Sequence, residues 1–385
     1  MNAGKYIFAQ LVEVLPHRIF DGIVKKYDGD KYVKHFTCWN QLLVMMFGQL
    51  SNRDSMRDLI FTINAHSKKL YHLGMGKSVT RSNLGKANER RDSKIFEEFA
   101  YHMIEMARVR RRSKDFEIDG QVYAFDSTTI DLCLNVFWWA KFRKNKGGIK
   151  VHTLYDVNTS IPSFIHITPA RVHDVKAMDE IPYETDSYYV FDRGYYDLKR
   201  LKRINDIGAY FVIRPKKATR YIPKEVNDTN HNANGILCDD IVEFDTPVAN
   251  RRYEGQIRRV IYYAADLNKT FVYLTNNFDI TAETVALLYK KRWEVELFFK
   301  WVKQHLKIKS FWGCTENAVK IQIYSAIIAY CMVAIVEHDL QLNKSTYEVL
   351  RIFSVSLLDK TPIKTLFTDD VVCEKEDLQL YLNFF

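Results

Sequence analysis

The sequence predicts a mixed α/β protein in which a helical region precedes a strand-rich core. Apolar residues first recur at helical spacing, up to about residue 115. From about residue 116 they form short runs that end in polar residues, as buried strands do. After a polar, turn-rich stretch the chain returns to long helical patterns from residue 282. With 385 residues, we expect about two or three domains.

The first 115 residues predict an all-helical domain that binds DNA. Trp39–Leu50 is apolar with helical spacing, and Ser51–Ser55 then breaks the pattern and offers caps for the next helix. Ser78–Arg91 alternates short polar residues with Arg and Lys before a further predicted helix, Phe96–Ala107. A helix-turn-helix-like DNA contact is one interpretation, and a solvated helix pair is the other. The basic run Arg108–Arg112 predicts a linker that contacts phosphates or simply faces water.

Residues 116–340 predict a catalytic α/β domain with a β insertion at about 216–275. The predicted strands of the core are Gln121–Phe125, Gly148–Tyr155, Ile161–Thr168, Ser187–Phe191 and Ala209–Ile213. Their alternation with helical patterns indicates a mixed sheet. Ile257–Tyr263 and Thr270–Leu274 predict strands of the insertion. Helices Ala282–Leu306 and Glu316–Asp339 follow, and residues 341–385 predict a helical tail.

Charge and cysteine usage point to a basic protein of the reducing cytoplasm. The net charge of +9 favours a polyanionic partner, of which nucleic acid is the usual one. None of the six cysteines forms a C-x-x-C pair, so neither a zinc site nor a disulfide framework is indicated. The N-terminus lacks the pattern of a signal peptide. The most apolar stretch, Ile321–Val336, is short for a bilayer and predicts a buried core helix, so we expect no membrane partner.

Two acidic residues, Asp126 and Asp192, each follow an apolar strand pattern directly. Carboxylates at the ends of neighbouring strands lie at the open edge of a sheet, where ligands bind. A single aspartate there usually caps a turn, but two in one sheet can hold a hard cation such as Mg²⁺.

The predicted helix Ala282–Leu306 places four polar side chains on one stripe. At about 100° per residue, Tyr289, Arg292, Glu296 and Lys303 fall within about 60° of one another, between apolar faces that predict packing on several sides. A glutamate in that setting needs a partner, and a buried Arg292–Glu296 ion pair is the purely structural alternative. With the two aspartates it would instead complete a two-metal site for phosphoryl transfer.

Basic residues elsewhere predict a nucleic-acid track. They are Arg193, Arg214, Lys216, Lys217, Arg251, Arg252, Arg258 and Arg259, of which Arg193, Arg214 and Lys217 are the preferred DNA contacts.

The spacing from Tyr289 to Lys303 reads Y-x2-R-x3-E-x6-K, and this resembles the signature of the insertion-sequence-four family of bacterial DDE transposases. Val122–Thr128 and Val190–Tyr195 resemble the blocks that hold the first and second acids of that family, in the family's order. The resemblance covers about residues 120–335. The pair His173-Asp174 also resembles a family feature, with a structural role for the histidine as the alternative.

The resemblance implies an RNase H-like catalytic domain interrupted by the β insertion. It implies two Mg²⁺ (or Mn²⁺) ions held by Asp126, Asp192 and Glu296. It further implies a cut-and-paste transposase that acts as a homodimer on double-stranded transposon ends and target DNA, in the nucleoid. Such an enzyme nicks the element's end, forms and opens a hairpin, and joins the 3′ end to target DNA. Tyr289 and Arg292 match positions that hold the backbone beside a flipped base, and Lys303 matches a further DNA contact.

One departure from the family concerns the flipped base, which a relative stacks on a tryptophan of the insertion. Residues 216–275 contain no tryptophan here, and the candidate aromatics are Tyr221, Phe244, Tyr253, Tyr262 and Tyr263. Two alternatives to the transposase stay open. They are a metal-dependent nuclease without strand transfer and an inactive, transposase-derived DNA-binding repressor, although the intact acids argue against the repressor.

Overall fold

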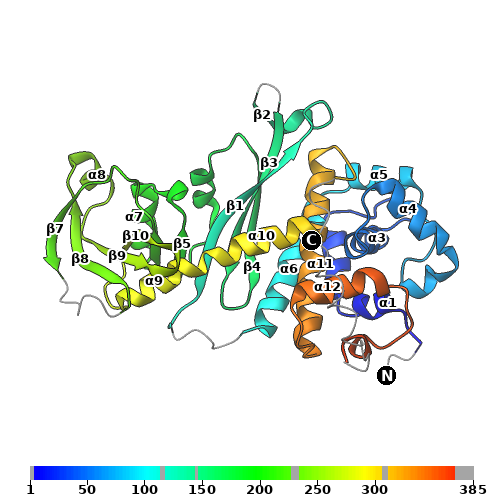
Figure 1. Cartoon of the computed structure of the whole chain (residues 1–385). Coiled ribbons are helices and arrows are strands. Elements are labelled where there is room, and N and C mark those ends of the chain that lie inside the picture. Colours follow the sequence, from blue (N-terminus) through cyan, green and yellow to red (C-terminus); the bar gives the residue numbers. More distant parts are fainter. Residues whose placement is uncertain (1–3, 113–117, 144–145, 227–233, 306–310, 369–385) are drawn as a thin grey trace, which may run out of the picture.

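The computed structural model describes residues 4–112, 118–143, 146–226, 234–305 and 311–368. A body of helices lies at one end, a sheet occupies the middle, and the last strands of that sheet form the other end (Figure 1). Both described ends of the chain lie in the helical body.

Helices from both ends of the chain build the helical body. They are α1 (Ile7–Val12), α2 (His17–Lys26), α3 (Cys38–Leu50), α4 (Met56–Ala65), α5 (Arg81–Arg90), α6 (Lys94–Arg110), α11 (Glu316–Asp339) and α12 (Thr346–Ser356). Ser55 caps α4 by accepting a hydrogen bond from the Asp58 amide, which confirms the predicted cap. The 24-residue α11 packs against α6 and α3, so one core joins residues far apart in sequence.

By length and composition alone, helix α11 is long and apolar enough to cross a membrane. The prediction that this segment is too short was wrong, because Ile321–Val336 is only part of the helix. Its apolar window is 94% buried inside the protein, as the core-helix prediction requires.

The predicted helix pair exists as α5 and α6, joined by the three residues Arg91–Ser93. The apolar face of α6 is buried through Phe96, Phe99 and Met103, whereas α5 exposes most of its polar side chains. The predicted linker at Arg108–Arg112 is wrong for its first part, because α6 continues to Arg110 and Arg108 bonds the buried Asp156 at 2.9 Å.

One sheet runs through the middle and far end of the molecule, in the order β2-β3-β1-β5-β6-β10-β9-β8-β7, with β4 pairing β3 on its other side. The core strands are β1 (Val122–Leu132), β2 (Lys141–Arg143), β3 (Lys146–Asp156), β4 (Ile161–Pro169), β5 (Tyr188–Phe191) and β6 (Tyr210–Ile213). The insertion supplies β7 (Tyr221–Val226), β8 (Ile236–Phe244), α8 (Pro247–Arg252), β9 (Ile257–Ala264) and β10 (Lys269–Thr275). Because β10 pairs β6, the insertion extends the catalytic sheet.

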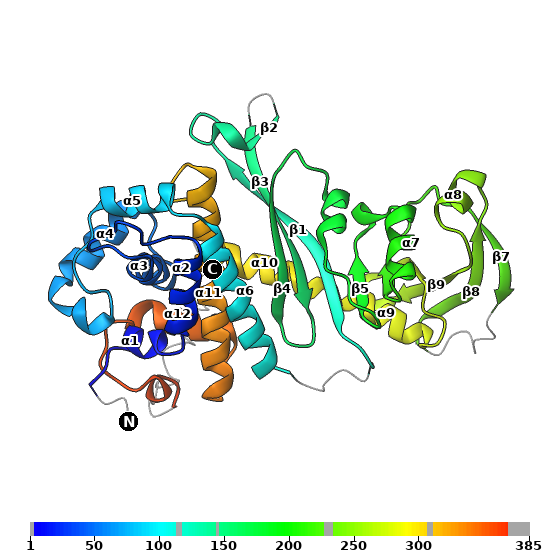
Figure 2. The ribbon, with the colours of Figure 1, turned by 180° about the vertical axis from the view of Figure 1, so that it is seen from behind.

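The two faces of the sheet are covered differently. Val122 and Ala124 of β1 join the core that continues into the helical body, and helix α10 (Trp293–His305) lies across this face. Tyr123 and Phe125 point the other way, into a second core that includes α7 (Leu198–Asp206). Figure 2 shows that opposite face, with α7 in front of the strands.

Strand β1 is longer than predicted. Its parallel partner β5 ends opposite Phe125, which is where the apolar run stops, but β3 continues to pair β1 as far as Leu132. Asp126 therefore lies within β1, at the point where β5 leaves it, and not at the end of a strand.

The predicted helix Ala282–Leu306 is broken into α9 (Ala282–Lys291) and α10. At the break the Arg292 amide bonds the carbonyl of Tyr289, three residues back, at 3.1 Å. Arg292 itself keeps helical dihedrals, with φ −53° and ψ −29°. The predicted stripe is confirmed, because Arg292 lies by Tyr289, pairs with Glu296 four residues on and reaches β1, as Lys303 does. The predicted packing on several sides is wrong, since Trp293 is 56% exposed and Leu297 is exposed too. The predicted last residue, Leu306, lies outside the described residues.

Candidate active site

Asp126 and Asp192 lie side by side because their strands are in register. The parallel pairing sets Phe125 opposite Phe191, so the next residue of each chain segment is an aspartate. Asp126 Oδ1 accepts a hydrogen bond from the Ser127 amide at 2.8 Å, and Asp192 Oδ1 accepts one from the Arg193 amide at 2.5 Å. Each carboxylate is thereby held by the backbone of the residue that follows it.

Helix α10 brings Glu296 to the same place. It crosses the sheet over β1 (Figure 1). The Arg292 guanidinium bridges the two elements, with Nη2 2.6 Å from Glu296 Oε1 and Nη1 3.2 Å from Asp126 Oδ2. Only 12% of the Arg292 side chain is exposed. The Arg292–Glu296 ion pair considered as a structural alternative therefore exists, and the same arginine connects Glu296 to a strand carboxylate.

The Asp126 carboxyl binds its proton more tightly than an exposed aspartate does. Burial, as the largest cause, raises the pKa of Asp126 to about 6, and the nearby carboxylates of Glu296 and Asp192 raise it further. The Ser127 amide and the Arg292 guanidinium lower this pKa without cancelling the rise. The charge of Arg292 therefore does not offset the burial of Asp126 and its nearness to the other two acids.

These three acids suit a hard divalent cation in chemistry, since all are oxygen donors. Among the described residues, however, no three His, Cys, Asp or Glu side chains converge closely enough to hold a metal. The Arg292 guanidinium stands between Asp126 and Glu296 and bonds both.

The other predicted contact residues surround the acids in different ways. Tyr289 is buried, with the Arg292 guanidinium 5.7 Å from its ring centre. Lys303 Nζ donates a hydrogen bond to the Thr129 carbonyl of β1 at 3.1 Å. Arg193 directly follows Asp192, whereas Lys217 is exposed in the loop after β6. Arg214 lies over the ring of Phe271, 5.0 Å from its centre.

Part of the predicted basic track lies inside the protein. Arg258 forms a buried bidentate pair with Asp239, at 2.7 and 2.8 Å, and Arg259 pairs with Asp240. Burial against its partner on the adjacent strand β8 keeps Arg258 from the surface, whereas Arg259 is paired but remains 21% exposed.

A cavity of about 880 Å³ adjoins the acids, between β9 and β10 on one side and α9 and α10 on the other. Its lining includes Arg214, Tyr262, Phe271, Tyr273, Tyr289, Arg292 and Trp293. It is a predominantly apolar and aromatic cavity with two guanidinium groups, one of which also bonds the acids.

The aromatic residues that the sequence left open lie at different places relative to this cavity. Tyr262 lines it, whereas Phe244 and Tyr253 are buried in the second core and Tyr221 packs against that core. Tyr263 bonds Asn268 at 2.8 Å instead. The sequence reasoning missed Phe271, Tyr273 and Trp293. The first two alternate along a predicted strand, and the third directly follows Arg292, so their positions did carry a signal.

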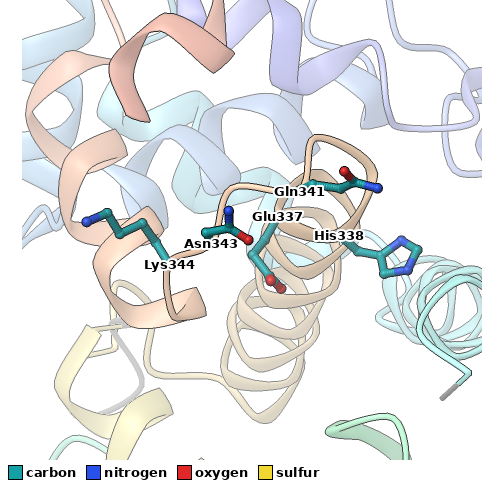
Figure 3. Close-up of a pocket in the computed structure, with 5 residues that line it drawn as sticks. All are labelled: Glu337, His338, Gln341, Asn343 and Lys344. Atoms are coloured by element: carbon teal, nitrogen blue, oxygen red, sulfur yellow. The ribbon is translucent and has the colours of Figure 1, made fainter. Parts of the chain in front are cut away.

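A second hollow, of about 470 Å³, lies at the end of α11 and is lined by Glu337, His338, Gln341, Asn343 and Lys344. Figure 3 shows His338 and Lys344 pointing away from each other rather than toward a common centre. The hollow offers no converging set of groups for a ligand.

The model of the transposase DDE domain matches residues 117–332, which include all three acids and the cavity. The chain belongs to the DDE transposase family. It is therefore a polynucleotidyl transferase with an RNase H-like catalytic domain, and enzymes of this family use divalent metal ions. Residues 3–76 match a domain of unknown function, DUF4372.

Relatives of the chain carry the names of putative or probable transposases, two of them for insertion sequence elements. The putative transposase y4zB of Sinorhizobium fredii is 33% identical over 70% of this chain and 74% of its own length. The putative transposase for insertion sequence element IS4SA of Synechocystis is 28% identical over 74% and 80%. The probable transposase for insertion sequence element IS5377 of Geobacillus stearothermophilus is 31% identical over 58% of each chain. A piggyBac transposase synaptic complex with hairpin DNA aligns over 98% of this chain and 82% of that one, at 13% identity and a TM-score of 0.45, which is too low to establish a common fold.

Proposed function

We propose that the transposase works by a cut-and-paste route, excising its element through a hairpin and joining the freed 3′ ends to target DNA. The observation that carries the proposal is the acidic cluster, in which Arg292 bridges Asp126 and Glu296 beside Asp192. The Y-x2-R-x3-E-x6-K spacing extends the proposal to the insertion-sequence-four family, and the IS4SA relative is consistent with it.

Asp126, Asp192 and Glu296 would hold two Mg²⁺ (or Mn²⁺) ions in this proposal. When bound, the ions would supply the charge that activates an attacking oxygen and stabilises a leaving one. The protein's own part is to fix the carboxylates, which the Ser127 and Arg193 amides do for the two aspartates. For the carboxylates to bind metal together, the Arg292 guanidinium has to release Asp126 or Glu296. A DNA phosphate is the natural alternative partner for that guanidinium.

The aromatic cavity would receive a nucleotide extruded from the transposon end. A volume of about 880 Å³ exceeds that of a single nucleobase, and Phe271, Tyr262 and Trp293 offer faces on which a base stacks. Arg214 and Arg292 at its wall suit the phosphates on either side of that nucleotide.

The helical body would bind the double-stranded end through α4, α5 and the segment between them. Residues 56–91 contain eight Lys and Arg against two Asp and Glu, a net charge of +6 within a chain of net charge +9. On α5, Arg81, Lys86 and Arg90 are exposed, and no ion pair joins them to any described acidic side chain. Because α6 is buried, α5 is the helix of this pair that can enter a groove. Lys217, Lys303 and Arg193 would contact DNA nearer the acids.

Two ends must be cut and joined together, so we propose that the enzyme acts as a homodimer on paired ends, in the bacterial nucleoid. No membrane is required for these steps.

The direct test is cleavage and strand transfer on DNA that carries the element's own end, in Mg²⁺, comparing the wild type with Glu296→Gln. We expect the wild type to cut and join while the variant still binds the end but does neither. Binding without cutting by the wild type would indicate a DNA-binding repressor, and cutting without joining would indicate a nuclease.

Two further readouts test the parts of the proposal separately. With 2-aminopurine near the cleaved end, hairpin formation should raise fluorescence as the base unstacks, and Phe271→Ala should reduce that rise while nicking persists. Lys86→Ala with Arg90→Ala should weaken end binding and flatten its dependence on salt, because phosphate contacts are lost. An unchanged salt dependence would remove α5 from the interface.

A further inference from the structure

A second polar cluster lies on the opposite face of the sheet, directly behind the acidic cluster. Ser127 Oγ donates a hydrogen bond to Asp174 Oδ1 at 2.7 Å, and Lys150 Nζ donates one to Asp174 Oδ2 at 3.0 Å. Lys150 also donates to the Val172 carbonyl at 2.9 Å. Both carboxylate oxygens of Asp174 are therefore engaged by groups of the protein.

This cluster contacts β1 just beyond the point where the strand loses its neighbour β5. Beyond Phe125 the strand has lost its neighbour β5 and is bonded to β3 alone. Side chains alternate along a strand, so Asp126 faces α10 while Ser127 faces the 3₁₀ turn that begins at Asp174. Through its bond to Ser127, Asp174 thus anchors the edge of β1 that no longer pairs with β5, at the residue next to Asp126.

The same serine holds Asp126 through its backbone, because its amide donates to Asp126 Oδ1 at 2.8 Å. A change in the position of Ser127 would move that amide and, with it, the carboxylate. The chain Lys150–Asp174–Ser127–Asp126 is continuous, with every link within hydrogen-bond distance.

We propose that Asp174 is a positioning residue that, through Ser127, holds the Asp126 carboxylate at the place in the sheet where it would bind metal once Arg292 releases an acid. The inference rests on the proposed function, in that Asp126 is a metal ligand there. It also gives a role to the sequence pair His173-Asp174, in which the aspartate bonds Ser127 and the histidine does not. Partners that orient metal ligands typically change metal affinity by about 10- to 100-fold when removed.

The test is equilibrium Mn²⁺ binding to the full-length protein without DNA, followed by electron paramagnetic resonance of the free ion. Ser127→Ala is the central variant, because Asp174→Ala also leaves the Lys150 amine without its carboxylate. Ser127→Thr keeps the hydroxyl. Asp179→Ala is the matched control, since Asp179 lies on the same 3₁₀ turn but pairs with Arg200 on the surface.

We expect Ser127→Ala and Asp174→Ala each to weaken Mn²⁺ binding by about 10-fold or more, and the double variant to be no weaker than Asp174→Ala alone. Ser127→Thr should restore wild-type affinity, and Asp179→Ala should keep it. End binding in EDTA and the melting temperature of Ser127→Ala should stay near the wild type.

Several outcomes would overturn the inference. Wild-type affinity in Ser127→Ala would do so, as would additive losses in the double variant or a failure of Ser127→Thr to rescue. Asp126→Asn separates this result from the proposed function. If the wild type binds Mn²⁺ and Asp126→Asn does not, the proposed metal site is supported, whatever Ser127→Ala shows. If the wild type does not bind Mn²⁺, both the proposed metal site and the positioning role of Asp174 are rejected.

Discussion

The buried pair Arg258–Asp239 gives the sharpest test of how the insertion is held to the catalytic domain. Arg258 on β9 engages both oxygens of Asp239 on β8, and it also donates to the carbonyls of Asn277 and Ile280 in the segment before α9. The side chains are only 5% and 4% exposed. One guanidinium therefore connects two strands of the insertion to the start of the helical segment that leads to Glu296.

Arg258→Ala would leave the Asp239 carboxylate buried without its cation and two carbonyls without their donor. Breaking a buried, hydrogen-bonded ion pair from one side costs about 3–5 kcal/mol. Removing both charges is much milder, since a well-packed apolar pair of similar volume is often neutral. We therefore expect the double variant Arg258→Met with Asp239→Leu to recover most of the stability that Arg258→Ala loses.

Urea unfolding followed by tryptophan fluorescence measures this loss, and end-DNA binding below the unfolding transition measures any role in recognition. Arg251→Ala, on the exposed face of α8, is the matched control and should leave the unfolding midpoint unchanged. If Arg258→Ala weakened DNA binding while the midpoint stayed at the wild-type value, Arg258 would be a DNA contact and the structural reasoning would be refuted.

Three further predictions concern the helical body and the sheet. Gly48→Ala should destabilise the protein by about 1–3 kcal/mol despite alanine's better helix propensity, because its Cβ would lie 2.3 Å from the Trp312 ring; calorimetry would show a lower melting temperature. Burial lowers the pKa of His152 from 6.5 to about 4, so this histidine binds its proton more weakly when folded. Its contribution to stability is complete above pH 6.5 and is lost as the pH falls toward 4, by up to about 3 kcal/mol, and His152→Gln should lessen the acid sensitivity of unfolding. Thr80→Ala should cost about 1 kcal/mol in thermal unfolding, because the Thr80 side chain caps α5 by accepting from the Asn83 amide.

What the sequence could predict depended on whether the decisive contacts were local. Asp126 and Asp192 were found because each follows an apolar run, and Glu296 because three neighbours at fixed spacing accompany it. The length of β1 was not predictable from its own residues, since β3 sustains it after β5 has ended. Likewise, nothing near Arg258 in sequence indicates that an aspartate nineteen residues away removes it from the surface.

The segment around Arg292 joins the two parts of the site. Arg292 reaches Asp126, while Trp293, the next residue, remains 56% exposed at the wall of the aromatic cavity. Glu296 follows one turn later and meets the same guanidinium. Neighbouring residues of one short signature can therefore serve the acidic cluster and the cavity at once, as the reaction that we propose, at the backbone beside an extruded nucleotide, would require.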